Sequence, residues 1–188
     1  AGLEPARVTD LVHGSTVATN AILERKGAAV AFVTTRGFRD ILFFQRHDRR
    51  NIYDLRYKKP APPLRRKDCF EVSERLDARG DVVLALDEAR LRAELIPALA
   101  AGGYQAVAVC LLSAYAAPVH EARVKTLIQD ALPHLRVTCS HEVAREFREF
   151  ERATTTVLSA YVQPVIDGYL ERFEATLKLA QFPRNGAK

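Results

Sequence analysis

Residues 8–27 read VTDLVHGSTVATNAILERKG, and the rest of the chain repeats the order of elements that this stretch indicates. The pattern predicts a strand over residues 8–13, a turn at residues 14–16 and a helix over residues 17–26. A turn of small residues that opens a helix directs free backbone N–H groups and the positive end of the helix dipole toward one point. Such a point suits an anion, for example a phosphate group.

The polar residues of this turn have a second interpretation. Ser15 or Thr16 is a good N-cap, so plain helix capping is the alternative to an anion site. The glycines and lysine of a phosphate loop, and those of the GxGxxG dinucleotide motif, are missing. His13 ends the predicted buried strand, where it either contacts a phosphate or acts as an acid, or is a hydrogen-bonded structural histidine.

Downstream, strands and helices alternate along the sequence. The predicted strands are 28–34, 106–112 and 136–140, with an antiparallel hairpin over 70–76 and 82–86, and the predicted helices are 38–45, 88–101 with Asp87 as its cap, 119–132, and 145–180 with a kink at Pro164. Strand-helix-strand order implies right-handed crossovers and parallel pairing. The fold class is therefore predicted as α/β, with a mixed, largely parallel sheet, flanking helices and a long final helix.

The length and composition favour one domain, or one domain and part of another. With 188 residues and 48% hydrophobic residues, the chain is long enough to bury a core. No apolar run approaches the roughly 18 residues of a membrane span, so a cytoplasmic location is expected. The sequence contains no methionine and starts a few residues before a predicted strand, so we expect a piece of a longer polypeptide.

The cysteines and histidines do not form a metal-binding pattern. Cys69, Cys110 and Cys139 are widely spaced, and two of them lie in apolar strands, so they are expected to be buried small side chains. The five histidines occur in none of the spacings typical of metal sites, and no metal ligand is assigned.

Positive charge is concentrated in one segment. Residues 46–67 contain nine basic and two acidic residues, whereas the whole chain carries a net charge of +5. Three prolines and the aromatic residues Tyr53 and Tyr57 lie in the same segment. A long basic loop of this kind is expected to meet a partner or an acidic substrate; nucleic acid is the less favoured alternative, because no nucleic-acid-binding motif accompanies it.

Carboxylates cluster where the long helix is predicted to begin. Glu142, Glu146, Glu149 and Glu151 include residue types that serve as a general base or as Mg²⁺ ligands. Glutamate and arginine alternate here at helical spacing, which favours a solvated helix face with ion pairs three residues apart.

Four stretches, in order along the chain, resemble motifs of the hydantoinase A/5-oxoprolinase family. Residues 13–27 are similar to its signature HGTTVATNALLERKG, with Ser15 in place of the more usual threonine. The other three are residues 33–40, residues 106–115 followed by Pro118 and His120-Glu121, and residues 142–164. The resemblance covers nearly the whole chain.

The resemblance implies part of an ATP-using enzyme of the actin-like, ribonuclease H-like ATPase superfamily, related to N-methylhydantoinase, 5-oxoprolinase and the acetone and acetophenone carboxylases. In that family ATP, with Mg²⁺, drives an uphill step by phosphorylating a cyclic amide or enol oxygen, beside a hydantoinase B-type subunit or domain. The implied function is ATP-dependent hydrolysis of a cyclic amide. The alternatives are an ATP-dependent ketone carboxylase subunit and a non-catalytic binding or assembly module that uses the basic loop 46–67.

The resemblance also implies which residues face ligands. The nucleotide or substrate side is assigned to His13, Gly14, Ser15, Thr16 and Asn20, and the substrate or partner side to Arg36 and Arg39. No catalytic residue is assigned.

The family pattern also indicates how the chain is organised. The family's first phosphate loop is expected just before residue 1, and its later glycine-rich motifs after residue 188. We therefore expect this chain to form one wall of an active site and to be inactive alone. The expected organisation is an N-terminal-type α/β domain over 1–145 that lacks its first strands, a helix over 146–182 leading toward a second domain, and a disordered tail over 183–188.

Overall fold

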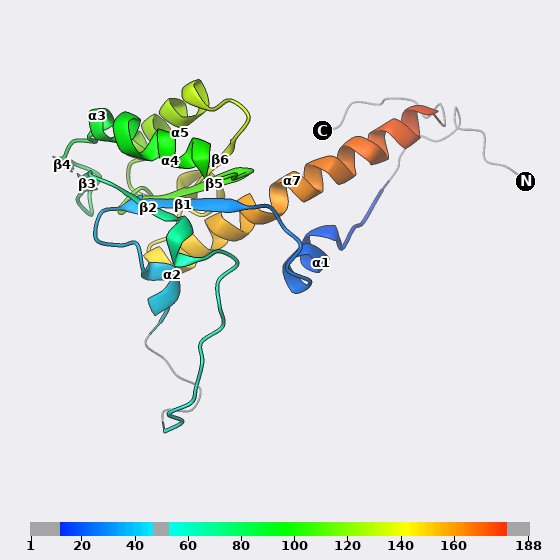
Figure 1. The fold of residues 1–188 in the computed structure, drawn as a ribbon, viewed down its shortest axis with the longest axis horizontal. Coiled ribbons are helices and arrows are strands. Elements are labelled where there is room, and N and C mark those ends of the chain that lie inside the picture. The colour runs from blue at the N-terminus through cyan, green and yellow to red at the C-terminus, as the bar shows by residue number, and fades with distance from the viewer. Residues whose placement is uncertain (1–11, 47–52, 180–188) are drawn as a thin grey trace, which may run out of the picture. The chain divides into compact units, whose positions relative to one another are not determined.

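The computed structural model describes residues 12–46 and 53–179 (Figure 1). Residues 28–161 form one compact unit, and the described residues 12–27 and 162–179 belong to a second. The expected domain boundaries at residues 145 and 182 stay predictions. Most of the predicted strand over 8–13, part of the basic loop and the tail over 183–188 fall outside the described residues.

A four-stranded parallel sheet organises the larger unit. Its strands are β1 (Val30–Thr35), β2 (Cys69–Val72), β5 (Ala106–Cys110) and β6 (Arg136–Cys139), in the order β2-β1-β5-β6. Every residue of β1 and β5 is buried, because both central strands are covered on both faces. The predicted α/β class with a largely parallel sheet is confirmed.

Helices cover the two faces of this sheet (Figure 1). The segment Glu88–Ala101, made of α3 (Glu88–Arg90), η3 (Leu91–Leu95) and α4 (Ile96–Ala101), lies with α5 (Val119–Ala131) on one face. On the other face are α2 (Ile41–Phe44) and the first turns of α7 (Glu149–Leu179), which continues into the second unit.

Alternation along the strands distributes the core between the two faces. Ala31 and Val33 of β1, and Val107 and Val109 of β5, pack in one cluster with buried leucines of η3, α4 and α5. Phe32 lies between Ala31 and Val33 in β1, so its side chain points to the opposite face of the sheet, where it is also fully buried.

The strand order creates a switch point between β1 and β5. The chain leaves β1 toward β2 on one side and leaves β5 toward β6 on the other. In open parallel sheets, ligands bind outside the carboxyl ends of the strands at such a point. Here Thr35 ends β1, and Leu111 and Leu112 follow β5.

Two helices have local features that the sequence explains. The carboxylate of Asp87 accepts from the Arg90 backbone N–H at 2.9 Å, which confirms the predicted cap. The middle of the same helical segment has a wider π-type turn at Leu91–Leu95. Pro97 lies two residues after this turn, and its missing N–H and bulky ring disturb the regular bonding of the preceding turn.

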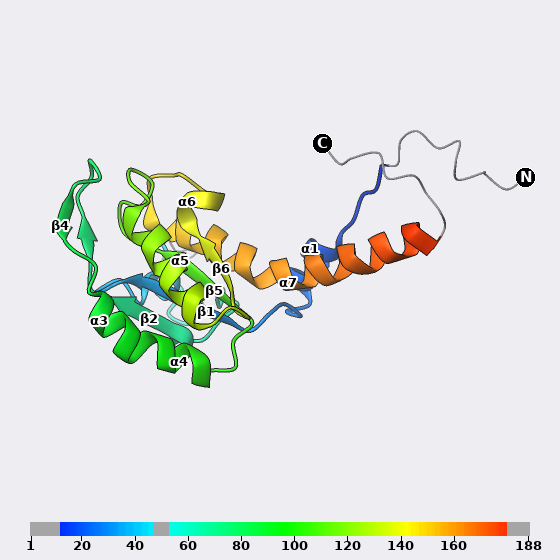
Figure 2. The ribbon, with the colours of Figure 1, turned by 90° about the horizontal axis from the view of Figure 1, so that it is seen from above.

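The hairpin prediction was partly wrong. Residues 69–72 form β2, an edge strand parallel to β1, and only β3 (Arg75–Leu76) pairs antiparallel with β4 (Val82–Leu84), as Figure 2 shows beside the main sheet. The long link between α2 and β2 allows the crossover that parallel pairing needs. At the hairpin turn, a Cβ atom on Gly80 would lie 2.8 Å from the Ala117 Cβ, so the turn packs closely on the loop after β5.

Three predicted helices are shorter than expected. α1 (Val17–Leu23) ends before Arg25, whose φ of +53° lies in the left-handed region. α2 spans only Ile41–Phe44, and α7 begins at Glu149 rather than at 145 because Arg148, with φ of +100°, interrupts regular helix geometry. Short α6 (Ser140–Val143) follows β6 and was not predicted.

Pro164 lies inside α7, within the second unit. No helix among the described residues is long and apolar enough to cross a membrane.

Candidate functional site

The predicted anion loop lies in the smaller unit and is exposed. His13, Gly14, Ser15, Thr16 and Asn20 are all exposed, and a Cβ atom at Gly14 would meet no atom within 4 Å. Ser15 Oγ accepts from the Val17 backbone N–H at 3.2 Å, whereas the Thr16 side chain makes no capping hydrogen bond. The structure therefore brings the five residues into one segment and leaves its donors accessible.

Aromatic residues of α7 hold His13 beside this loop. The imidazole ring stacks on Phe173 at 4.4 Å and on Tyr169 at 5.7 Å between ring centroids, and Nε2 is hydrogen-bonded to the Tyr169 hydroxyl. The placement of His13 at the end of a buried strand was wrong, because residues 12–16 have no regular secondary structure. The contacts with α7 come from residues 156 and 160 positions away, which no local pattern reveals.

Arg36 and Arg39 lie in the larger unit, after the end of β1. Arg36 is exposed, and Arg39 is half-buried with Nη2 donating to the Arg66 carbonyl at 3.2 Å. Arg39 also lines a cavity of about 230 Å³ with residues of β2 and of the helical segment, including Arg90 and Glu94. Arg90 and Glu94 pair with each other at 2.9 Å, so the cavity has no single sign of charge.

Several residues of the basic loop fold back onto the chain. Arg66 makes a bidentate ion pair with Asp40, in which Nε donates to Oδ1 at 2.5 Å and Nη2 donates to Oδ2 at 2.9 Å. This hydrogen bonding holds the pKa of Asp40 below its usual value. Lys59 donates to the backbone carbonyls of Phe44 and Arg46. Lys59 and Arg66 are therefore engaged within the chain, although the sequence had suggested that the basic loop meets a partner or an acidic substrate.

Two members of the carboxylate cluster have structural roles. Glu142 pairs with Lys125 at 2.6 Å and accepts from the Cys139 backbone N–H at 3.2 Å, and Glu151 pairs with Arg46. Burial alone would raise the pKa of Glu142, but the Lys125 and Cys139 hydrogen bonds outweigh it and lower the value.

Sequence reasoning missed a buried polar network at the switch point. Thr35 Oγ1 donates to Glu74, which is 2% exposed, and accepts from the Leu112 backbone N–H at 2.9 Å. The second carboxylate oxygen of Glu74 lies 2.7 Å from His120 Nδ1. The network joins the ends of β1 and β5 to the start of α5.

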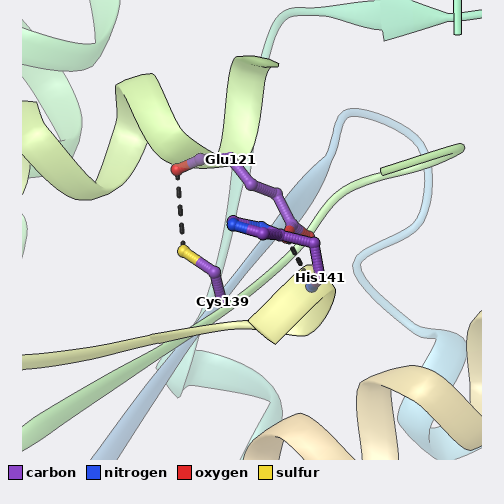
Figure 3. A group of neighbouring side chains, drawn as sticks. All are labelled: Glu121, Cys139 and His141. Carbon is purple, nitrogen blue, oxygen red and sulfur yellow. Dashed lines mark hydrogen bonds and ion pairs between the residues drawn. The ribbon is translucent and has the colours of Figure 1, made fainter. Parts of the chain in front are cut away.

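Glu121, the next residue, is the centre of a second network (Figure 3). Its fully buried carboxylate accepts from the Leu111 backbone N–H at 2.8 Å, from Ser140 Oγ at 2.6 Å, and from His141 at both the backbone N–H, 3.0 Å, and Nδ1, 2.7 Å. The only earlier signal was the presence of His120-Glu121 in a family-like stretch.

Glu121, Cys139 and His141 bring metal-type ligand atoms within 4.8 Å of one another. The hydrogen bonds, however, already occupy both Glu121 oxygens and His141 Nδ1. Burial raises the pKa of the Cys139 thiol, so the thiol stays neutral and donates to the Glu121 carbonyl. The arrangement fits a hydrogen-bonded hub that fixes the loop after β5, rather than a metal centre.

Arg152 departs most from the sequence prediction of a solvated helix face. It is fully buried, and its Nη2 donates to the Leu111 carbonyl at 2.6 Å. The guanidinium also lies over the Tyr115 ring, 5.4 Å from its centroid. Leu111 is therefore held from both sides, by Glu121 at its N–H and by Arg152 at its carbonyl.

Comparison with known proteins identifies the family of this chain. The model of a family described as hydantoinase/oxoprolinase N-terminal region matches residues 1–132. The chain is 34% identical over 172 residues to the acetophenone carboxylase gamma subunit of Aromatoleum aromaticum, covering 84% of this chain and 23% of that protein. It is 33% identical over 166 residues to caprolactamase subunit alpha of Pseudomonas jessenii, covering 87% and 24%.

A solved structure agrees with these sequence relatives. The ATP-dependent caprolactamase from Pseudomonas jessenii superposes with a TM-score of 0.79 at 31% identity, over 90% of this chain and 25% of that chain. The chain thus spans about a quarter of the length of these two relatives.

Proposed function

The chain belongs to the hydantoinase/oxoprolinase N-terminal family, and we propose that it forms one wall of the active site of an ATP-dependent hydrolase that opens cyclic amides. The observation that carries the proposal is the exposed loop at residues 13–16, which lies within the segment that the family model matches. The similarity to a caprolactamase subunit supports a cyclic amide as substrate.

The loop residues fit a phosphate group. Ser15 and Thr16 present hydroxyl donors at the start of α1, and the open space at Gly14 lets a ligand approach the backbone. Asn20 Nδ2 donates to Thr16 Oγ1 at 3.4 Å and has a second N–H for a ligand. These donors would hold a nucleotide phosphate, and the stacking on Phe173 and Tyr169 would fix His13 beside it.

The chemistry that ATP supplies when bound is phosphorylation of the carbonyl or enol oxygen, which makes a poor leaving oxygen a good one. For this chain, the proposed role is to bind and orient phosphate through the loop residues. Glu142 and Glu151 are engaged with Lys125 and Arg46, so we assign Mg²⁺ to the nucleotide and not to these two carboxylates.

The remaining parts of the site come from other polypeptide. Because the relatives are about four times as long as this chain, we infer that the chain alone lacks a complete nucleotide site and is inactive. The relatives named as subunits support a partner, which we propose to be a hydantoinase B-type subunit or domain. Arg36 is exposed and is the better placed of the two arginines to meet substrate or that partner.

The second candidate function is ATP-dependent ketone carboxylation. The 34% identity to an acetophenone carboxylase subunit favours it. A pure binding module that uses the basic loop has less support, because Lys59 and Arg66 are engaged within the chain.

The test replaces Thr16 and His13 by alanine in the protein that carries this chain and measures ATP hydrolysis with caprolactam, 5-oxoproline or hydantoin. Loss of one hydroxyl donor to a phosphate should lower kcat/KM for ATP by roughly tenfold or more. Thr19→Ala, an exposed change on the same helix, is the matched control and should have no effect.

Unchanged turnover in both loop variants would remove this loop from the site. Turnover that requires bicarbonate and a ketone, and not a cyclic amide, would select the carboxylase function.

A further inference from the structure

Arg152 is the largest fully buried side chain among the described residues, and it makes no ion pair with any of them. Nη2 donates to the Leu111 carbonyl, while Nε and Nη1 are buried with no hydrogen-bond partner in residues 12–46 and 53–179. An isolated buried guanidinium is costly, so such groups are normally paired with an anion or fully hydrogen-bonded.

The described residues around Arg152 do not supply that anion. Burial raises the pKa of the neighbouring Cys110 thiol to about 12, although Arg152 itself lowers it, so the thiol remains neutral at pH 7. The carboxylate of Glu121 is already shared among Leu111, Ser140 and His141. Glu151, the neighbour in sequence, pairs with Arg46.

An aromatic cover lies over the guanidinium. The Tyr115 ring faces Arg152, and Phe147 meets Tyr115 edge-on at 5.9 Å between centroids. Phe147 is 71% exposed, so this cover is in contact with solvent. Displacing these two rings would uncover the side of the guanidinium that Tyr115 covers.

The backbone on both sides of the cover is in an uncommon conformation. Ser113 has φ of +57° and Arg148 has φ of +100°, both left-handed values that cost energy in residues with a side chain. These residues lie within two positions of Tyr115 and Phe147, respectively. Strain of this kind is retained where surrounding structure imposes it, and it is found most often at ligand sites and switch segments.

The position in the fold also suits a ligand. Arg152 bonds to Leu111, which follows the carboxyl end of β5 at the switch point with β1. Two nitrogen donors of one planar guanidinium match the two oxygens of a carboxylate or phosphate group.

We propose that Arg152 is the anchor of an oxyanion subsite beneath Tyr115 and Phe147, which takes a carboxylate or phosphate group at the carboxyl end of β5. The second N–H of Nη2 and one of the free nitrogens, Nε or Nη1, lie along one edge of the guanidinium and bind two oxygens of the anion, and the aromatic cover excludes water once the anion has entered. This subsite lies in the unit of residues 28–161 and does not depend on the nucleotide assignment of residues 13–16.

The test is the thermal stability of the chain in phosphate, acetate and chloride at matched ionic strength, followed by circular dichroism. For a chain of this size, a specific anion at about ten times its Kd should raise the midpoint by roughly 4 °C over chloride. If only phosphate raises the midpoint, the ligand is a phosphate group, and if only acetate raises it, the ligand is a carboxylate. Equal midpoints in all three salts would overturn the proposal.

Arg152→Met keeps the side-chain volume and removes the charge, so it should abolish the anion-dependent rise. Arg92→Met, an exposed change in the same unit, is the matched control and should keep the full rise. A rise that persists in Arg152→Met would place the anion elsewhere and overturn the proposal. If Arg152→Met does not fold, Arg152→Lys keeps one charge without the planar fork and should reduce the rise by more than half.

Phe147→Ala tests the cover, and because Phe147 is exposed this variant should fold normally. The anion concentration that gives half of the rise in midpoint should fall by roughly threefold or more in this variant, since less cover must be displaced for the anion to enter. An unchanged anion concentration would show that Phe147 does not cover the subsite.

Discussion

Replacing Glu121 by glutamine should destabilise the larger unit more than any single surface change. Glutamine keeps the shape of the side chain but turns one carboxylate oxygen into a donor. Ser140 and the His141 ring adapt by rotating the hydroxyl or changing tautomer. The backbone N–H groups of Leu111 and His141 cannot adapt, so either amide orientation leaves one of them facing a donor.

The magnitude follows from these contacts. A buried N–H without an acceptor costs about 1–3 kcal/mol, and weakening hydrogen bonds to a charged acceptor costs about 1 kcal/mol more. We therefore expect Glu121→Gln to lower the free energy of unfolding by about 3 kcal/mol. Urea unfolding at equilibrium measures this change, with the slope held constant between variants.

Glu94→Gln is the control, because its carboxylate makes an exposed ion pair with Arg90 at 2.9 Å. It should change the free energy of unfolding by less than about 1 kcal/mol. If the free energy of unfolding of Glu121→Gln lies within about 0.5 kcal/mol of the parent value, which is the scale of ordinary surface changes, the proposed role of Glu121 as a hydrogen-bonded hub is refuted. A large rise in parent stability on adding zinc, lost in Glu121→Gln, would show instead that the residues bind metal.

Three further outcomes follow from the structure. Burial would raise the pKa of Asp68, but hydrogen bonds from Arg65 and Tyr104 lower it. The stabilisation is thus present above the unfolded value near pH 4 and lost as pH falls, so Asp68→Asn should cost stability at pH 7 and little at about pH 2 in urea titrations. Gly80 has φ of +93°, and a Cβ atom there would lie 2.8 Å from the Ala117 Cβ, whereas Gly103 has φ of +65° and no atom within 4 Å of such a Cβ. Gly80→Ala should therefore lower the free energy of unfolding by about 1 kcal/mol more than Gly103→Ala does. Equal unfolding midpoints of the two variants would contradict the close packing of the turn. Burial raises the pKa of Cys69 and Cys110 to about 12 and also raises the pKa of Cys139. The three thiols should therefore react slowly with an aromatic disulfide at pH 8 until urea unfolds the chain. Fast reaction of the native chain would contradict this.

The central sheet was predictable because its strands carry a strong local signal. The apolar runs around Val30–Thr35 and Ala106–Cys110 are of strand length, and helical patterns follow each of them. Parallel order then follows from the right-handed crossover rule. β2 was assigned to a hairpin because the sequence around it resembles an antiparallel pair, whereas its partner β1 lies more than thirty residues earlier.

The polar site was harder to predict because charge patterns do not reveal burial. Arg152 lies among alternating glutamates and arginines, a pattern typical of solvated helices, yet contacts with Leu111 and Tyr115 bury it. Glu74 and Glu121 are hydrogen-bonded to residues that lie 10 to 46 positions away from them in the sequence. The loop at residues 13–16 was recognisable from family resemblance, but its contacts with Tyr169 and Phe173 required the structure.

The most direct test of the proposed function is calorimetric titration of the 188-residue chain with Mg-ATP, after circular dichroism has shown cooperative unfolding. If the chain is one wall of a shared site, the folded chain should give no saturable heat in the micromolar range. A longer protein that contains the chain should bind Mg-ATP in that range, and Thr16→Ala should weaken this binding. Micromolar binding by the 188-residue chain alone would contradict the account, because the nucleotide site would then lie within these residues.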